Sequence, residues 1–353
     1  MSLPVEPPIA PMLARLVREI PVGSFAYEPK WDGFRCLAFR DRDEVDLRSR
    51  HDRPLARYFP EVVAALGRLR ADRIVLDGEI VLLGPAAFDF GVLMSRLHPA
   101  ASRVERLSAA SPATFIAFDV IALGDADLRG EPFSVRRAQL EAIVGPGDPG
   151  IRVTPLTMGA TTATEWLERF RGGGIDGVVA KPLEGRYEPG KRAMVKVKTT
   201  RTADCVVAGL RQRPDGAVSS LLLGLWDDTG SLRHVGVVTQ LPGDARREVA
   251  TELRPDVVPI EEHPWREGFA IGASPIGRLL GSASRWTPEM GLDWVPLAPR
   301  RVVEVAFDQV DTDRFRHPAR LVRWRPDRDP ESCSIDQILV TPMPGDAVER
   351  VAG

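Results

Sequence analysis

The chain of 353 residues has few cysteines and no long apolar run, and these two absences exclude whole classes of protein. Its three cysteines, Cys36, Cys205 and Cys333, are odd in number, lie far apart and form no C-x-x-C pair. A disulfide framework and a zinc knuckle are therefore not expected. No apolar stretch approaches the roughly 18 residues of a membrane span, and the N-terminus lacks the pattern of a secretory signal. We expect a protein of the reducing cytoplasm without a membrane partner.

Lysine is scarce as well. Lys and Arg number 47 together, of which five are lysine, so 42 are arginine. Arginine stays protonated, whereas a lysine amine can lose its proton and act as a nucleophile. The few positions that keep lysine are therefore the first candidates for chemistry. Four of the five fall within 18 residues, which weakens the alternative that they are scattered by chance. The five are Lys30, Lys181, Lys191, Lys196 and Lys198.

The net charge of −2 says little about partners, but the distribution of arginine says more. Six arginines fall in residues 35–53 and six in residues 314–328. Either cluster alone could be a solvated face. Two clusters on a nearly neutral chain predict a local site for a polyanion.

The length and the pattern of apolar residues predict two domains and a tail. We expect the first domain at 1–200, the second at 201–330 and the tail at 331–353. The opening Pro-rich segment is expected to lie extended on the surface, and residues 199–203 to form a polar connector. In the first domain, alternation predicts strands and helical spacing predicts helices. The strands are expected at 34–39, 44–47, 114–123, 176–181 and 194–198, with two shorter pieces within 73–83, and the helices at 60–70, 135–143 and 163–171.

The second domain reads as a small barrel. Five short strands and one helix within about 130 residues favour the five-stranded nucleic-acid-binding type. The strands are expected at 204–210, 220–226, 232–238, 302–307 and 321–325, and the helix at 244–253.

Lys30 begins a series of ordered motifs. It stands in Lys30-x-Asp32-Gly33-x-Arg35, which we expect in a turn that enters a strand. Alone, this hexad is weakly specific, because a lysine in a turn is usually a surface residue. The motifs that follow in order are Ser49-Arg50, Asp77-Gly78-Glu79, Phe118-Asp119, Asp176–Lys181, Lys196-Val197-Lys198 and Arg323–Arg328.

This series resembles the covalent nucleotidyltransferases, which comprise polynucleotide ligases and messenger-RNA capping enzymes. The narrower likeness is to stand-alone bacterial ATP-dependent DNA ligases of the ligase C kind, carried by residues 302–308, 314–328 and 333–339. The resemblance implies an α+β fold, in which an adenylation domain of antiparallel sheets with flanking helices precedes an OB-fold barrel. It also implies a monomer that acts on nicked double-stranded DNA.

The resemblance further implies that Lys30 attacks the α-phosphate of ATP and captures AMP, which then passes to a DNA 5′-phosphate before the nick is sealed. Asp32 and Asp176 would hold Mg²⁺, for which Mn²⁺ can substitute. ATP or phosphate contacts are implied for Glu28, Arg35, Arg50, Glu79, Phe118, Lys181, Lys196, Lys198 and Arg325.

Three of these residues would recognise the nucleoside. Glu79 would hold the ribose hydroxyls, Phe118 would stack on adenine, and Glu28 would read the amino edge of the base. From the residues alone, Glu79 could instead pair with an arginine and Phe118 could be plain core. Two departures from the family pattern are Asp176, where many ligases have Glu, and Arg328, where the last motif usually ends in lysine.

A competing hypothesis is an RNA ligase or a capping guanylyltransferase, since both use the same lysine chemistry. The Arg-rich composition, typical of a GC-rich bacterial genome, weakens the capping alternative.

Overall fold

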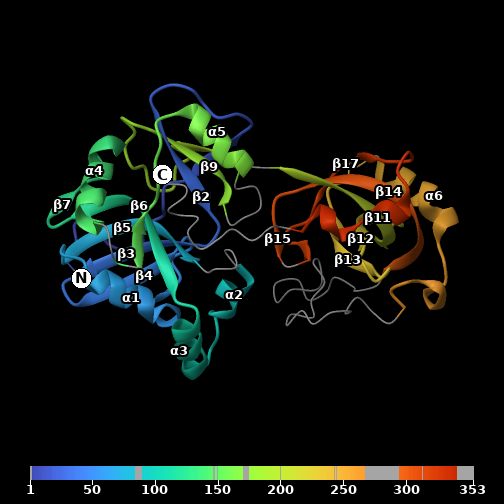
Figure 1. The fold of residues 1–353 in the computed structure, drawn as a ribbon, viewed down its shortest axis with the longest axis horizontal. Helices are drawn as coiled ribbons and strands as arrows, with labels where there is room; N and C mark the ends of the chain where they lie inside the picture. The colour runs from blue at the N-terminus through green and yellow to red at the C-terminus, as the bar shows by residue number, and fades with distance from the viewer. Residues whose placement is uncertain are drawn as a thin grey trace. The chain divides into compact units, whose positions relative to one another are not determined.

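In the computed structural model the chain forms two compact units. The first lies within Met1–Thr199 and the second within Thr200–Val340. The structure describes residues 2–83, 90–145, 148, 150–169, 175–198, 200–241, 243, 245–266, 294–311 and 313–339. Both units combine antiparallel strands with a few helices (Figure 1), so the predicted α+β class is confirmed. Within the described residues, no helix is long and apolar enough to cross a membrane.

A six-stranded sheet forms one layer of the first unit. Its strands, in spatial order, are β4 (Glu44–Ser49), β3 (Phe34–Asp41), β5 (Arg73–Leu82), β6 (Ala113–Leu123) and β7 (Ala126–Asp127), with β8 (Ile151–Val153) parallel to β6. The expected break at Asp77-Gly78 is wrong, because β5 runs unbroken through both residues. Gly78 is needed there for close packing, since a Cβ atom would collide with the ring of Phe115. A register shift between Asp77 and Gly78 accommodates the approach of β6.

A second sheet of four strands carries the first lysine motif. Its order is β1 (Ala14–Val17), β10 (Met194–Lys198), β9 (Ile175–Pro182) and β2 (Phe25–Trp31). Lys30 lies inside β2 rather than in a turn before β3, because the pairing of β2 with β9 continues past it through a register shift between Pro29 and Trp31.

The opening segment is not the surface extension that we expected. Leu3, Val5 and Met12 are buried against the first unit. Strand β1 follows directly and pairs in parallel with β10. Apolar residues interrupted by prolines can cover a core without any periodic pattern, which explains the error.

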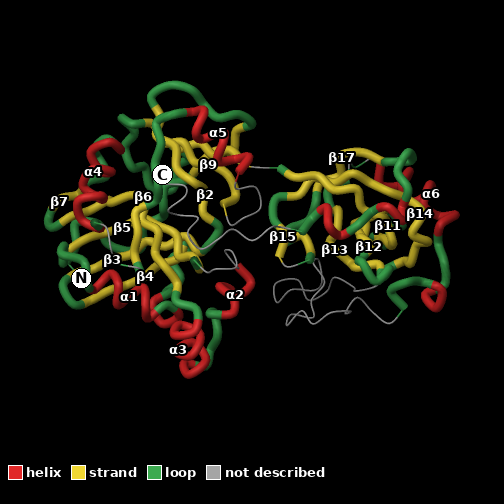
Figure 2. Tube along the Cα trace, in the orientation of Figure 1, coloured by secondary structure: helices red, strands yellow, loops and turns green. Residues whose placement is uncertain are grey.

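Helices flank both sheets of the first unit (Figure 2). Helices α1 (Pro60–Gly67) and α4 (Phe133–Val144) pack on the six-stranded sheet, and α5 (Ala160–Arg169) packs on β9 and β2. Helix α4 follows Pro132, whose fixed φ suits the start of a helix. The helices of this unit are η1 (Ala56–Tyr58), α1 (Pro60–Gly67), α2 (Phe90–Ser95), α3 (Ala101–Ala110), α4 (Phe133–Val144) and α5 (Ala160–Arg169).

The second unit is built on a five-stranded antiparallel sheet. Its order is β13 (Leu232–Val238), β12 (Val218–Trp226), β11 (Arg201–Gln212), β14 (Val295–Phe307) and β17 (Arg320–Trp324). An isolated bridge joins Val238 to Ala319, and the Ala319 N–H donates to Val237 O at 2.8 Å. The first and last strands of the sheet therefore meet, as in a small closed barrel, and the predicted OB-fold is confirmed.

The remaining elements of the second unit are short. They are β15 (Val310–Asp311), β16 (Arg314–Phe315), α6 (Ala245–Leu253), η2 (Arg254–Asp256), η3 (Ile260–Glu262), η4 (Pro330–Ser332) and η5 (Ile335–Gln337). The expected connector at 199–203 is wrong from Arg201 onward, because β11 begins there. Of the proposed tail, Cys333 and Ile338 are buried in the core of this unit, and residues 340–353 lie outside the described residues.

Candidate active site

One cavity in the first unit gathers most of the predicted site residues. It encloses about 200 Å³. Strands β2, β3, β5, β6, β9 and β10 all contribute to its wall, so the two sheets meet around it. The predicted residues that line it are Glu28, Lys30, Arg35, Arg50, Glu79, Phe118, Lys181 and Lys196.

Asp176 and Lys198 join the cavity through Lys30. The Lys30 Nζ lies 2.7 Å from Asp176 Oδ2, and the Lys198 Nζ lies 3.3 Å from the same oxygen. The Asp176 carboxylate is 4% exposed, so these charges interact with little screening by solvent. Asp176 therefore holds the amine of Lys30 in place at the rim of the cavity.

Lys196 and Lys198 project from the same face of β10, as their spacing predicted. Burial lowers the pKa of Lys196, and the nearby charges of Lys30 and Lys198 lower it further. A cluster of cations in a partly buried cavity is suited to bind phosphates, because each bound phosphate relieves the repulsion among them.

Glu28 is a buried residue of the cavity lining and contacts two cations. Its Oε2 lies 2.8 Å from the Lys181 Nζ, and its Oε1 lies 3.3 Å from Nη1 of Arg137. Burial raises the pKa of Glu28, whereas the charges of Lys181 and Arg137 oppose that rise. Lys181 is itself 2% exposed. Lys181 therefore lines the cavity and at the same time forms an ion pair with a neighbouring side chain, Glu28.

Two cations lie close to the ring of Phe118. The Arg35 guanidinium lies 4.4 Å from the ring centroid and the Lys181 Nζ lies 4.9 Å from it. Lys181 also donates a hydrogen bond of 2.7 Å to the Phe118 carbonyl. Although Phe118 belongs to the buried strand β6, it lines the cavity, so the alternative of plain core is not its whole role.

A buried carboxylate orients Arg35. Asp77 accepts hydrogen bonds from Nε and Nη2 of Arg35, each at 2.6 Å, and another of 2.7 Å from the Tyr187 hydroxyl. The Met12 N–H in turn donates to the Tyr187 oxygen at 3.1 Å. The guanidinium is therefore held in a single plane beside Phe118.

Glu79 lines the cavity without a close cation. Among the described residues, no ion pair within 4.0 Å includes it, which goes against the alternative that it serves only to pair with an arginine. Burial raises the pKa of Glu79 to about 7, although Arg35 and Lys30 oppose the rise.

Two carboxylates, Asp32 and Asp176, are predicted to hold Mg²⁺. Asp176 contacts Lys30, and Asp32 is partly buried two residues beyond that lysine. The described part of the chain has no group of three or more His, Cys, Asp or Glu side chains arranged to hold a metal. Two carboxylates suit Mg²⁺, which usually binds one or two of them together with substrate phosphates.

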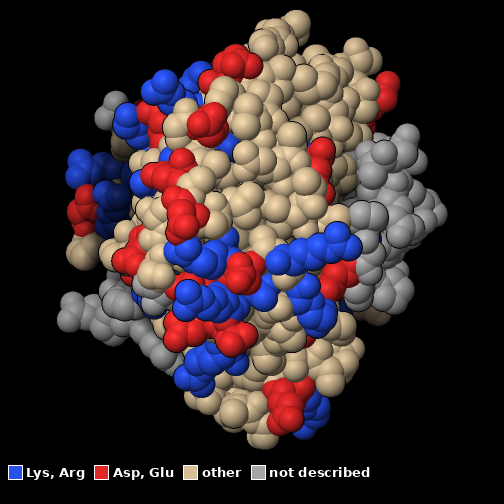
Figure 3. Space-filling view, turned by 90° about the vertical axis from the view of Figure 1, so that its left-hand side faces the viewer, with Lys and Arg blue, Asp and Glu red and all other residues tan. Residues whose placement is uncertain are grey.

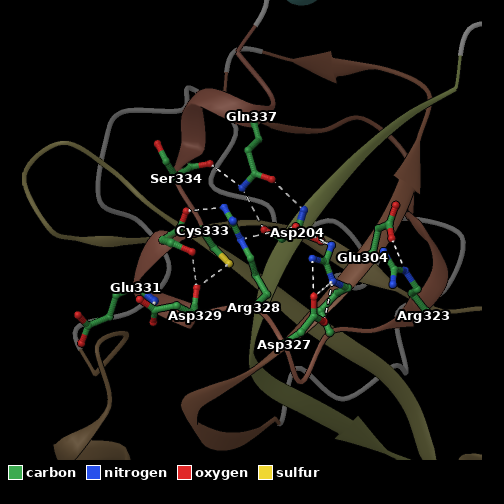
Figure 4. A network of polar contacts seen from close by, with 12 residues as sticks. Asp204, Glu304, Arg323, Asp327, Arg328, Asp329, Glu331, Cys333, Ser334 and Gln337 are labelled. Atoms are coloured by element: carbon green, nitrogen blue, oxygen red, sulfur yellow. Dashed lines mark hydrogen bonds and ion pairs between the residues drawn. The ribbon is translucent and has the colours of Figure 1, made fainter.

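Arg325 lies in the second unit, apart from the lining of this cavity. Its Nη1 lies 3.0 Å from both Asp204 oxygens, and its Nη2 lies 2.9 Å from Asp327 Oδ2. Gln337 accepts from the Asp204 N–H and donates to the Asp204 carbonyl, as Figure 4 shows. The network ties the last motif to β11, with Arg328 Nε 3.7 Å from Asp204.

Several residues around the cavity were not anticipated. Arg137 of α4 contacts Glu28, and Tyr187 reaches Asp77 from a loop. The sequence does not indicate either residue, because a single Arg or Tyr outside the motifs has no spacing that would mark it as part of a site. The unanticipated residues of the lining itself are Pro11, Leu13, Ala14, Pro29, Trp31, Val179, Arg192 and Met194.

Comparison with known proteins agrees with this architecture. Residues 10–198 match the ATP dependent DNA ligase domain, and residues 214–328 match the ATP dependent DNA ligase C terminal region. The chain is 52% identical over 341 residues to DNA ligase C2 of Mycolicibacterium smegmatis, covering 96% of each chain. It is 50% identical over 344 residues to DNA ligase C of Mycobacterium tuberculosis, again covering 96% of each.

A solved structure of a Lig E DNA ligase has a similar fold, with a TM-score of 0.53 and 18% identity over 90% of this chain and 100% of that one. The predicted likeness to ligases of the C kind is confirmed by the two mycobacterial relatives. Since the family models match both units and the relatives extend along almost the whole sequence, the chain belongs to the ATP-dependent DNA ligases.

Proposed function

We propose that the protein seals nicks in duplex DNA and that Lys30 carries AMP between ATP and the DNA. The observation that supports this most directly is the cavity itself, whose lining includes Lys30, the ring of Phe118, the carboxyl group of Glu79 and the amine of Lys196. An aromatic ring and carboxylates are suited to a nucleoside, and amines are suited to its phosphates.

The reaction would proceed in three phosphoryl-type transfers. The Lys30 amine, once deprotonated, attacks the α-phosphorus of ATP, so that an N–P bond forms and pyrophosphate leaves. An oxygen of the DNA 5′-phosphate then attacks the same phosphorus, and the N–P bond breaks. Finally the 3′-hydroxyl attacks the 5′-phosphate, loses its proton and releases AMP. Covalent capture divides one difficult condensation into easier steps.

The residues of the cavity would divide the work of binding ATP. Phe118 stacks on the adenine, Glu28 accepts from its amino group, and Glu79 accepts from the ribose hydroxyls. Lys181, Lys196 and Lys198 neutralise phosphate charge, and Arg325 orients the pyrophosphate. Because little covalent chemistry is asked of the protein in phosphoryl transfer, this positioning and charge neutralisation would supply most of the catalysis.

Asp32 and Asp176 would hold Mg²⁺, or Mn²⁺ in its place, together with the phosphates of ATP. A metal there supplies charge neutralisation on the transferred phosphoryl group. Asp176 is shorter by one methylene than the glutamate of many ligases, so contact through a water is as suitable as direct contact.

The DNA would be held by its phosphates, with Arg35 and Arg50 bordering the nick, and the protein would act as a monomer. Figure 3 shows Lys and Arg interspersed with Asp and Glu on the face that it displays, rather than gathered into a surface of one sign.

The test of Lys30 is its replacement by the cation that this chain otherwise prefers. We expect Lys30→Arg to abolish capture of AMP from labelled ATP and magnesium, because a guanidinium keeps its proton. Lys191→Arg is the matched control, since Lys191 is 73% exposed and pairs with Glu188 outside the cavity. Mass spectrometry would detect the adduct. A normal yield of adduct in Lys30→Arg would remove Lys30 as the nucleophile.

The same preparation separates the alternatives. Labelling by ATP but not GTP, followed by sealing of a DNA nick, is expected for a DNA ligase. Labelling by GTP would favour a capping enzyme, and sealing of RNA but not of DNA would favour an RNA ligase.

A further inference from the structure

Helix α4 stands behind the wall that would face the nucleobase. Two consecutive arginines of this helix contact residues in that wall or next to it. Arg136 is fully buried and holds Asp119, the residue after Phe118, at 2.7 and 3.0 Å. Arg137 reaches Glu28 with a distance of 3.3 Å from Nη1 to Oε1. One helix thus supports both the ring and the carboxylate of the proposed base site.

Arg137 is bound at three points, which restricts its guanidinium. Besides Glu28, Nη2 donates a hydrogen bond of 2.7 Å to the Thr154 carbonyl, and Nε donates one of 2.6 Å to Glu141 in the same helix. Thr154 also accepts a hydrogen bond of 2.8 Å at Oγ1 from the indole of Trp31. The contacts of Arg137 therefore extend to both ends of the segment 28–31 that carries Lys30.

The two oxygens of Glu28 have different partners. Oε2 contacts Lys181 at 2.8 Å, and Oε1 contacts Arg137. A carboxylate offers about four acceptor sites, so each oxygen keeps capacity for one further donor. The side chain of Glu28 is 3% exposed, so without these cations its ionised form would be disfavoured by burial. Arg137 lies outside the cavity lining and can act on a ligand through Glu28.

We infer that Arg137 is a positioning residue that orients the carboxylate of Glu28 and so determines the selectivity of the site for a purine with a 6-amino group. This rests on the proposed role of Glu28 as the acceptor for that amino group. Removing Arg137 leaves Glu28 held at one oxygen, free to rotate or to take up a proton. A protonated or rotated carboxyl group no longer accepts selectively from the base.

The experiment compares ATP with purine riboside triphosphate, which lacks the 6-amino group, in the full-length protein. The ratio of their efficiencies in forming the lysyl adduct is measured for wild type, Glu28→Gln, Arg137→Gln and the double variant. We expect Arg137→Gln to lower the preference for ATP about tenfold, mainly through KM, which corresponds to losing one hydrogen bond to a charged group. Arg137→Lys should recover part of it. In the Glu28→Gln background, Arg137→Gln should change the preference no further.

Binding and folding are measured alongside. Calorimetric titration of both triphosphates into Lys30→Met protein should show the same loss of preference without any chemistry. Arg68→Gln is the matched control, since Arg68 is exposed, forms an ion pair with Asp148 and is not among the residues that line the cavity. Thermal melting would identify variants that fail to fold, in which case Arg137→Lys carries the comparison.

The outcomes separate the inference from the proposal beneath it. Two results would contradict the inference and leave the proposed role of Glu28 intact. In the first, Glu28→Gln lowers the preference for ATP but Arg137→Gln does not. In the second, Arg137→Gln lowers the preference as much in the Glu28→Gln background as in wild type, so Arg137 does not act through Glu28. If Glu28→Gln leaves the preference unchanged, the proposed role of Glu28 fails and the inference fails with it.

Discussion

Glu79 shows at the scale of one residue how a carboxyl group in the lining of a cavity can lower stability. Burial raises the pKa of this carboxyl group from its ordinary value of 4.5 to about 7. The unfolded chain therefore loses this proton at a lower pH than the folded chain does. The contribution of Glu79 to stability is then fully present below about pH 4.5 and is lost as the pH rises toward 7.

We predict that Glu79→Gln removes this decline. The free energy of unfolding of wild type, relative to the variant, should fall between pH 4.5 and 7 and level off above pH 7. The side chain is only partly shielded from solvent, so the expected difference is on the order of 1–3 kcal/mol. Urea denaturation at several pH values would measure it, with exposed Glu168→Gln as the control. Parallel curves for wild type and Glu79→Gln would contradict the shifted pKa.

The segment 183–193 is an element without regular structure that nevertheless reaches the site. Tyr187 is 3% exposed, and its hydroxyl connects Asp77 of β5 to the backbone of Met12 in the opening segment. Arg35 shares the same carboxylate. The loop that carries Tyr187, the opening segment at Met12 and the central strand β5 at Asp77 are thus joined through the buried hydroxyl group of Tyr187.

We predict that Tyr187→Phe destabilises the protein by about 1–3 kcal/mol, because Asp77 and the Met12 N–H each lose a partner while remaining buried. The bidentate pair of Arg35 with Asp77 persists, so capture of AMP should change less than stability. Chemical denaturation and adduct formation would be measured together. Tyr58→Phe is the matched control, since the Tyr58 hydroxyl makes no hydrogen bond to another described residue. Equal stability of the two variants would exclude this linking role.

At the scale of the whole molecule, each unit has cores of its own. Among the residues that the structure describes, three buried apolar clusters belong to the first unit and a separate one to the second. The pair β11 and β14 lies entirely within the second unit, so a chain ending before Arg201 disrupts no strand of the first.

We therefore predict that residues 1–199 fold and form some enzyme–AMP from added ATP but seal nicks poorly. The proposed nucleoside contacts lie in this part, whereas the barrel and Arg325 do not. Circular dichroism, adduct formation and a nick-sealing assay would be compared with the full chain. Sealing at the rate of the full chain would show that the barrel is dispensable.

The interaction of the whole molecule with DNA should depend strongly on salt. No base-reading motif appears in the sequence, so binding should proceed by displacing counterions from phosphates. We predict that Arg50→Ala flattens the log–log salt slope by roughly one unit without creating sequence preference. Binding of a nicked duplex across a salt series, with several flanking sequences, would measure this. An unchanged slope would place Arg50 outside the DNA site, and strong dependence on flanking bases would contradict phosphate reading altogether.

Many features of this protein are determined by residues that are close together in the sequence. Strand alternation, helical spacing and the scarcity of lysine are properties of neighbouring residues, so they predicted most elements and the lysines of the cavity. Lys191, the one lysine that belongs to none of the ordered motifs, is exposed. The ordered motifs are likewise short stretches of sequence, and they indicated the family.

Other features depend on residues far apart in the chain. The sequence predicted two strand pieces around Asp77-Gly78, whereas in the fold β5 runs through both residues and Phe115 packs against Gly78. The Pro-rich start was expected at the surface, whereas Met12 is buried and donates its N–H to Tyr187. Arg137 is one of 42 arginines, and only folding brings it to Glu28, 109 residues away in the chain. A short-range pattern can specify which residues form a strand or helix, but pairing of buried charges is decided by tertiary packing, because its free energy arises only when distant elements exclude water together.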